Sequence, residues 1–207
     1  ASYDLLDTAE IAEKLPQLHV SEWSSASADN LYISSKIPFG FNYVDRNLDV
    51  IHTNDDQGEH GSHVAGIAAA NRYLKKDDGT FVSALQAVHM AGNAPDAQVL
   101  VMKVFGTGGG AYTDDYMAAI EDAIILGCDT VNLSLGSSTA GMAYSEELSG
   151  MLESLSNSGT VVTISAGNSG AWAENTANGD LYSDDVNFQT GGSPGSYTNS
   201  LGVASVD

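Results

Sequence analysis

The second half of the chain alternates between short apolar runs and amphipathic stretches with a helical period. Residues 97–105 are almost continuously apolar, which is typical of a strand covered on both faces. A helix is predicted from Thr113, with apolar side chains on one face and Gly127 after its end. A strand at 130–135, a helix at 145–158 and strands at 160–166 and 201–206 follow. This order predicts βαβ units, and hence parallel strands with right-handed crossovers.

The N-terminal part of the chain carries weaker patterns. A helix is predicted at 7–15, where Pro16 stops it, and the polar stretch at 21–30 is predicted to be a loop. Apolar residues at alternate positions predict a strand at 37–44, and Pro38 favours an edge position for it. The small side chains at 60–70 predict a helix buried against a sheet, and 75–80 predicts a charged turn.

Together these elements predict an α/β fold: a three-layer architecture with a mostly parallel sheet and helices on both faces. In such a sheet, ligands bind at the carboxyl ends of the strands. The glycine-rich loop at 106–111 and Asn168, after the strand at 160–166, both fall at such ends. The site is therefore expected at this edge.

Composition and charge exclude some classes of function. The chain has 207 residues, enough for one sizeable core, and carries 7 basic against 27 acidic residues, a net charge of -20. This charge repels a phosphate backbone, so nucleic acid is not expected as a partner. No apolar run is long enough to predict a membrane span. The single cysteine, Cys128, permits no internal disulfide and is expected to be a small core residue.

Two polar residues far apart in the sequence suggest acyl-transfer chemistry. His60 stands at a predicted loop-to-helix junction between Gly58 and Gly61, where a histidine can act as a general base. Asn168 follows a buried-type strand, where a neutral amide can donate to an oxyanion. A zinc site on His60 and His63 is a rival interpretation, but the i, i+3 spacing lacks the internal glutamate of HEXXH sites. His63 is therefore predicted to be a buried, hydrogen-bonding histidine.

The segment 106–111 fits the pattern G-x-G-x-x-A and so supports a second class, a dinucleotide-binding module. The acidic residue that should end the next strand to bind the ribose is missing, because Ser134, Leu135 and Gly136 stand there. The alternative is an open edge at Gly108, Gly109 and Gly110 that pairs with an extended peptide. Asp77 and Asp78, or the acidic stretch 178–185, could hold calcium, but neither has a recognised ligand spacing, and no cofactor is expected.

Four separated blocks resemble the subtilisin-like serine proteases, the subtilases. The segment 59–67, EHGSHVAGI, resembles the catalytic-histidine block, with Ser62 in place of threonine. The segment 130–136, TVNLSLG, is similar to the strand that lines the primary specificity pocket, and 163–168, TISAGN, resembles the block ending in the oxyanion asparagine. The segment 103–112 resembles the edge that pairs with substrate. The first 54 residues resemble the long insert of the cell-envelope proteinase and C5a-peptidase-like branch.

The resemblance implies a serine endopeptidase in which His60 is the general base and Asn168 the oxyanion donor. It implies a substrate-binding surface formed by one set of backbone segments: Gly108, Gly109, Gly110, Ser134, Leu135, Gly136, Ser165, Ala166 and Gly167. It also implies a protein or peptide substrate and a secreted or cell-envelope location.

Two blocks of the family are missing from these residues: the aspartate strand and the nucleophile block Gly-Thr-Ser-Met-Ala. The chain is therefore expected to be the middle of a larger enzyme, incomplete at both ends of the sheet, partnered by the remainder of the catalytic domain and inactive alone. Residues 1–54 are expected to form the insert and 55–207 part of the catalytic domain. The alternative is a catalytically silent peptide-binding or adhesin module.

Overall fold

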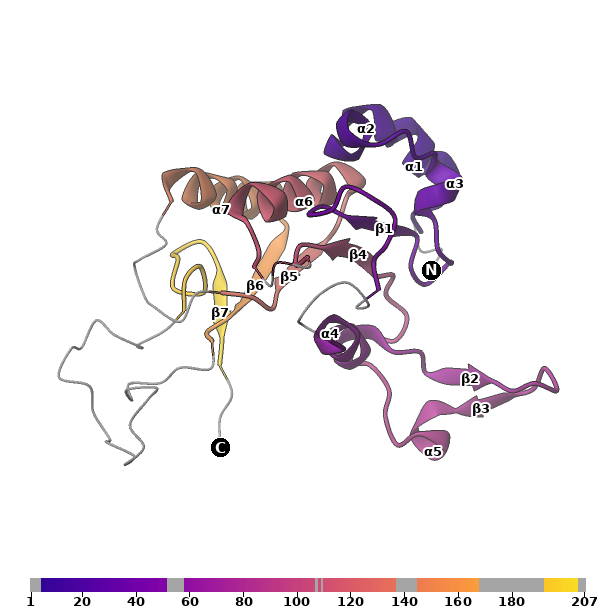
Figure 1. Ribbon diagram of the computed structural model, residues 1–207. Coiled ribbons are helices and arrows are strands. Elements are labelled where there is room, and N and C mark those ends of the chain that lie inside the picture. The colour runs from indigo at the N-terminus through magenta and orange to yellow at the C-terminus, as the bar shows by residue number, and fades with distance from the viewer. Residues whose placement is uncertain are drawn as a thin grey trace, which may run out of the picture. The chain divides into compact units, whose positions relative to one another are not determined.

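The computed structural model describes residues 5–51, 58–106, 108, 110–136, 145–167 and 192–204. The chain divides into two compact units, Ala1–Leu126 and Gly127–Asp207. The expected division at residue 54 stays a prediction. Figure 1 shows the elements of each unit in chain order.

The first unit begins with short helices where the sequence predicted one helix and a loop. Helix α1 (Thr8–Lys14) has Asp7 as its N-cap, and η1 (Leu15–Gln17) follows at Pro16. Helices α2 (His19–Trp23) and α3 (Ala28–Leu31) occupy the stretch expected to be a loop, so that prediction is wrong. A capping box at Ser27 and Asn30 starts α3, and Val20 and Leu31 are fully buried. Such short helices are stabilised by the burial of these isolated apolar residues more than by intrinsic helix propensity.

The core of the first unit forms around two parallel strands. Strand β1 (Phe39–Asn42) pairs with β4 (Leu100–Lys103), with Phe39 opposite Leu100. Helix α6 (Thr113–Leu126) contributes to the same core, whose buried members are Ile11, Leu18, Val20, Ala28, Leu31, Phe39, Phe41, Tyr43, Ala118, Ala119 and Leu126. All four residues of β1 are buried, whereas those of β4 are half-buried. The prediction that β4 is covered on both faces is therefore wrong for the described part of the chain.

Helix α4 (His60–Ala69) and a hairpin form a separate part of the first unit. Strand β2 (Tyr73–Lys75) pairs antiparallel with β3 (Phe81–Ser83), and α5 (Ala84–Ala87) follows. The expected charged turn is confirmed as the turn of this hairpin, with Gly79 at φ 82°. The predicted boundaries of α4 are confirmed, but only Ala69 on it is buried. The small residues of α4 therefore do not bury it against a sheet in the structure.

The second unit has a parallel sheet with the order β5-β6-β7. Strands β5 (Thr130–Leu133), β6 (Val161–Ser165) and β7 (Leu201–Val203) lie beside α7 (Glu146–Ser158) in Figure 1. Ser145 caps α7, Gly159 ends it in the left-handed conformation, and its predicted apolar face is buried at Leu148, Met151, Leu152 and Leu155. The expected α/β fold with parallel strands is confirmed, as small sheets of two and three strands.

No helix in the described ranges has both the length and the apolar character needed to cross a bilayer.

Candidate active site

His60 is the first residue of α4, and its side chain is exposed. The preceding turn contains Gly58 at φ 55°, a left-handed conformation that favours glycine. The backbone N–H of His63 donates to the carbonyl of Glu59 at 2.9 Å and so closes the first turn of α4. An exposed imidazole at a helix start is accessible to a substrate, as a general base must be.

His63 differs from its prediction. It is exposed on α4, one turn from His60, and is not a buried histidine. The reason is that α4 is covered by little of the described chain beyond the segment 90–94. There, the N–H groups of Gly92, Asn93 and Ala94 donate to the carbonyls of Ala70, Ile67 and Ala68.

In the second unit, the ends of β5 and β6 lie side by side. Leu133 pairs with Ile164, so Ser134, Leu135 and Gly136 leave the sheet next to Ser165, Ala166 and Gly167. The hydroxyl of Ser165 donates to the carbonyl of Leu135 at 3.3 Å, and the N–H of Ala166 donates to Val203 at 2.8 Å. Parallel pairing therefore brings these two predicted substrate-binding segments together at the carboxyl edge.

A third segment at this edge was missed by the sequence analysis. The N–H of Gly192 donates to the carbonyl of Ala166 at 2.7 Å, and the peptide bond between Ser193 and Pro194 is cis. A Cβ on Gly136 would lie 3.0 Å from the carbonyl oxygen of Ser193, so glycine permits this close approach. The only signal in the sequence was a run of glycine, serine and proline just before the last strand.

Ser193 is an unusual member of this edge. It is 2% exposed, and its hydroxyl has no hydrogen-bond partner among the described residues. Most buried side-chain polar groups have a partner, and leaving one unmade costs about 1–3 kcal/mol. Ser193 is therefore a buried hydroxyl beside Gly136 that has no partner in the described part of the chain.

The structure describes only some of the remaining predicted site residues. Gly108 is exposed and Gly110 is half-buried, and neither is in a strand; a Cβ on Gly110 would meet nothing within 4 Å. Gly109 and Asn168 lie outside the described residues, as does the acidic stretch 178–185. Gly106 is buried, and a Cβ there would lie 2.7 Å from Val44, so a side chain would clash at the start of this loop.

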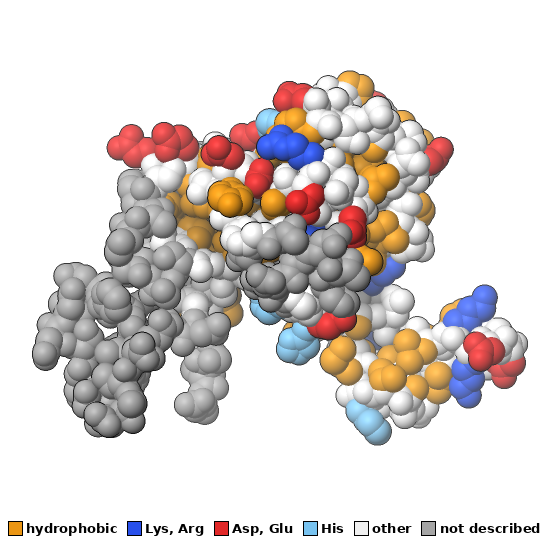
Figure 2. Space-filling view, in the orientation of Figure 1, with side chains coloured by type: hydrophobic (Ala, Val, Ile, Leu, Met, Phe, Trp, Pro, Cys, Tyr) orange, Lys and Arg blue, Asp and Glu red, His pale blue; other side chains and the backbone are white. Residues whose placement is uncertain are grey.

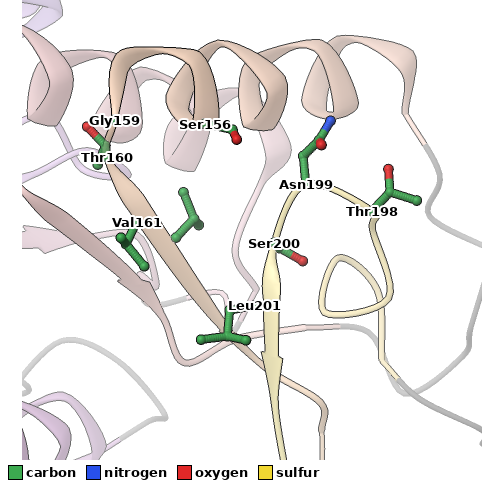
Figure 3. Close-up of a pocket in the computed structure, with 9 residues that line it drawn as sticks. Ser156, Gly159, Thr160, Val161, Thr198, Asn199, Ser200 and Leu201 are labelled. Carbon is green, nitrogen blue, oxygen red and sulfur yellow. The ribbon is translucent and has the colours of Figure 1, made fainter.

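A hollow of about 330 Å³ lies at the other end of the second unit's sheet. It is lined at the end of α7 and the starts of β6 and β7 by Ser156, Gly159, Thr160, Val161, Val162, Thr198, Asn199, Ser200 and Leu201. Figure 3 shows Ser156 on α7, and Asn199 and Ser200 on the segment leading into β7. Because it opens at the amino ends of the strands, it is separate from the carboxyl edge described above.

Similarity to known proteins identifies the family of this chain. The model of the subtilase family, peptidase S8, matches residues 28–207. The PIII-type proteinase of Lactococcus lactis subsp. cremoris (strain SK11) is 36% identical over 199 residues, which cover 94% of this chain and 10% of the relative. The chain thus spans about a tenth of the length of that relative.

Two further relatives and one solved structure are also similar to this chain. The minor extracellular protease Vpr of Bacillus subtilis (strain 168) is 35% identical over 63% of this chain and 15% of its own length. The C5a peptidase of Streptococcus pyogenes serotype M6 is 27% identical over 99% of this chain and 16% of its own. A solved S41 psychrophilic protease matches 71% of this chain and 39% of its own, at 26% identity and a TM-score of 0.47. The resemblance drawn from the four sequence blocks is confirmed: this chain belongs to the subtilase family.

Proposed function

We propose that this chain supplies the general base and the oxyanion donor of a serine endopeptidase. The observation that carries the proposal is the parallel register of β5 and β6 in a chain of the subtilase family. It brings Leu135 and Gly136 beside Ala166 and Gly167, and Asn168 is the next residue. In this proposal the sheet is part of a larger three-layer domain with helices on both faces.

In this mechanism, His60 removes the proton from a serine nucleophile and returns it to the leaving amine. The carboxamide of Asn168 donates to the oxyanion of the tetrahedral intermediate. The backbone of Gly108, Gly109 and Gly110 pairs with the extended substrate. Ser134 and Ser165 support the walls formed by Leu135, Gly136, Ala166 and Gly167, which hold the side chain before the cleaved bond.

The proposal is tested in the full-length protein with His60→Ala. Cleavage of a peptide substrate is expected to fall by at least ~10⁴-fold, because no base activates the serine. Asn168→Ala is expected to lower turnover by ~10²–10³-fold, a magnitude that was measured on a subtilisin. The control is His89→Asn, because His89 is exposed and asparagine tolerates its φ of 57°. Full cleavage by the His60→Ala protein would refute the proposal.

We also propose that these 207 residues alone do not cleave peptides. Their sequence contains no Gly-Thr-Ser-Met-Ala nucleophile block, so His60 has no serine to activate. The purified chain is expected to remain unlabelled by a serine-reactive fluorophosphonate. Stoichiometric labelling of Ser62, Ser134 or Ser165 would show that a nucleophile is present in the chain and would refute this part of the proposal.

The relatives also support a proposal for the location of the whole protein. Vpr is named an extracellular protease, and an acidic surface keeps an exported protein soluble. We place the whole protein outside the cell, secreted or held at a bacterial cell envelope, with protein or peptide substrates. Fractionation of the source cells is expected to recover it in the medium or the envelope fraction, and recovery in the cytosol would contradict this.

A further inference from the structure

Helix α4, which has His60 as its first residue, is covered by little of the described chain. Of its ten residues, only Ala69 is buried. Histidine side chains lie at the surface in Figure 2, and His60 is exposed in the structure. The position of His60 therefore depends on what holds the other end of the helix.

The last carbonyl groups of α4 are bound by a segment that follows α5. Carbonyls at the end of a helix have no partner within the helix and must find one elsewhere. Here the backbone N–H groups of residues 92–94 donate to three of them, at 2.8–3.0 Å. The carbonyl of Ile67 also accepts a hydrogen bond from Nδ2 of Asn93, at 3.1 Å. Asn93 thus binds the end of α4 through both its backbone and its side chain.

Gly92 brings this segment against the backbone of α4. It is buried, and a Cβ there would lie 2.2 Å from the nitrogen of Ala70 and 2.6 Å from Cα of Ala69. Ordinary contact begins at 3.4 Å, so a side chain at position 92 would push the segment and the helix apart by about 1 Å. The close approach therefore requires glycine at this position.

The same segment is attached to the core of the first unit. Lys36, which precedes β1, donates through Nζ to the carbonyl of Pro95 at 2.9 Å and to the carbonyl of Ala97. Residues 92–97 therefore connect the start of a core strand to the helix that carries His60.

We infer that residues 92–97 position His60 for proton transfer, and that Asn93 is the positioning side chain. The inference rests on the proposed function of His60 as the general base. A base must lie within hydrogen-bond distance of the proton that it removes, and a misplacement of about 1 Å can cost about a hundredfold in rate. By fixing the end of α4 against the core, the segment keeps His60 at one place in the first unit.

The test is the cleavage kinetics of three variants of the full-length protein. Gly92→Ala is expected to lower kcat by about a hundredfold, and Asn93→Leu, which removes only the side-chain donor, by about two- to fivefold. KM is expected to stay unchanged, because the segment is not part of the proposed substrate-binding surface. Asn93→Gln keeps an amide donor and is expected to recover part of the loss. The pH dependence of kcat should be the same in all three, because no substitution changes a charge.

Hydrogen exchange measured by mass spectrometry tests the attachment of α4 without relying on proteolysis. The amides of residues 60–70 are expected to exchange about fivefold faster in Asn93→Leu, because a hydrogen bond at the helix end is lost. Asn157→Leu, at an exposed position of α7, is the matched control and is expected to change neither exchange nor kcat. If the wild-type protein does not cleave peptides, the proposed function fails, while exchange still decides whether Asn93 anchors α4.

Four results would each overturn the inference: wild-type kcat in folded Gly92→Ala, unchanged exchange in Asn93→Leu, a change in KM alone, or an equal loss of kcat in Asn157→Leu. Circular dichroism of every variant checks that it is folded. If Gly92→Ala is unfolded, the comparison of Asn93→Leu with Asn93→Gln decides.

Discussion

A buried carboxylate joins distant parts of the first unit. The side chain of Asp122 is fully buried, accepts from the hydroxyl of Tyr43 at 2.9 Å and accepts from the backbone N–H of His19 at 2.8 Å. Burial raises the pKa of Asp122, although these two hydrogen bonds act to lower it. Both donors are therefore needed to keep the carboxylate in the core.

Tyr43→Phe removes one of these donors without changing the packing of the ring. The expected cost is about 1.5–3 kcal/mol of unfolding free energy, because the acceptor is a charged group. Tyr112→Phe is the control, since Tyr112 is 63% exposed and its loss should stay within about 0.5 kcal/mol. Urea titrations measure both. Equal costs would mean that Asp122 does not depend on Tyr43.

Two glycines have opposite steric surroundings. A Cβ on Gly92 would overlap the backbone of Ala69 and Ala70 at the end of α4, which cannot move as a flexible side chain can. A Cβ on Gly150, inside α7, would meet nothing within 4 Å. Only the first glycine is required by packing.

Alanine substitutions at these two positions should therefore change stability in opposite directions. Gly92→Ala is expected to destabilise by about 1–3 kcal/mol or more, as overpacking does. Gly150→Ala is expected to stabilise by about 0.5–1 kcal/mol, because alanine is the better helix former. Thermal unfolding measures both shifts, and a stabilising Gly92→Ala would contradict the close contact with α4.

At the scale of elements, the titratable side chain of His19 attaches α2 to α6. The ring of His19 contacts Glu121 through Nε2, lies 3.8 Å from Glu22 through Nδ1 and stacks on Trp23 at 5.6 Å. Burial lowers the pKa of His19, but the hydrogen bond to Glu121 and the charges of Asp122, Glu121 and Glu22 outweigh it and raise this pKa above 6.5.

The stability of the first unit should therefore fall as the pH rises through the pKa of folded His19. A raised pKa means that the contribution of His19 is complete below its ordinary value of 6.5 and is lost above the folded-state value. The raised pKa of Asp122 also lowers stability as the pH rises. The contribution of His19 is therefore taken as the difference in unfolding free energy between the wild type and His19→Gln.

Urea titrations that follow Trp23 fluorescence in a Trp172→Phe background measure this difference across the pH range. Glu121→Gln is expected to reduce it, because the main partner of His19 is gone. Glu153→Gln, an equal charge change at an exposed position of α7, is the control. A difference that grows with pH would have the wrong sign and would refute the attachment through His19.

Elements were predictable where one local signal was strong. Helix α7 has an apolar face and a terminal glycine, and both are found where the sequence predicted them, while Ser145, predicted as its first residue, is its N-cap. Helices α2 and α3 were missed because their few apolar residues show no period in a polar stretch. The hairpin of β2 and β3 was recognised only by its turn, since strands of three residues are too short to show alternation.

At the scale of the whole molecule, charge is the dominant feature. The 27 acidic residues exceed the basic residues by 20, and few of the described carboxylates have a basic partner. Like charges confined to a compact state repel one another, and this repulsion is screened by salt.

Sodium chloride is therefore expected to stabilise this protein. The urea midpoint should rise between low salt and about 0.5 M salt, where the Debye length is only a few ångströms, while the slope of the transition stays constant. Chloride is preferred to sulfate, because sulfate also strengthens apolar burial. A midpoint that falls with salt would mean that local ion pairs outweigh the net repulsion.

The sequence by itself determined the family, the parallel βαβ order, the boundaries of α4 and α7 and the segments that meet at the carboxyl edge of β5 and β6. These features depend on local periodicity and on short motifs, which are written in consecutive residues. Only the tertiary structure decided that Asp122 is buried, that His63 is exposed and that the segment at Gly192 and Ser193 joins the edge. The reason is that burial depends on partners far away in the chain: Tyr43 and Asp122 are 79 residues apart.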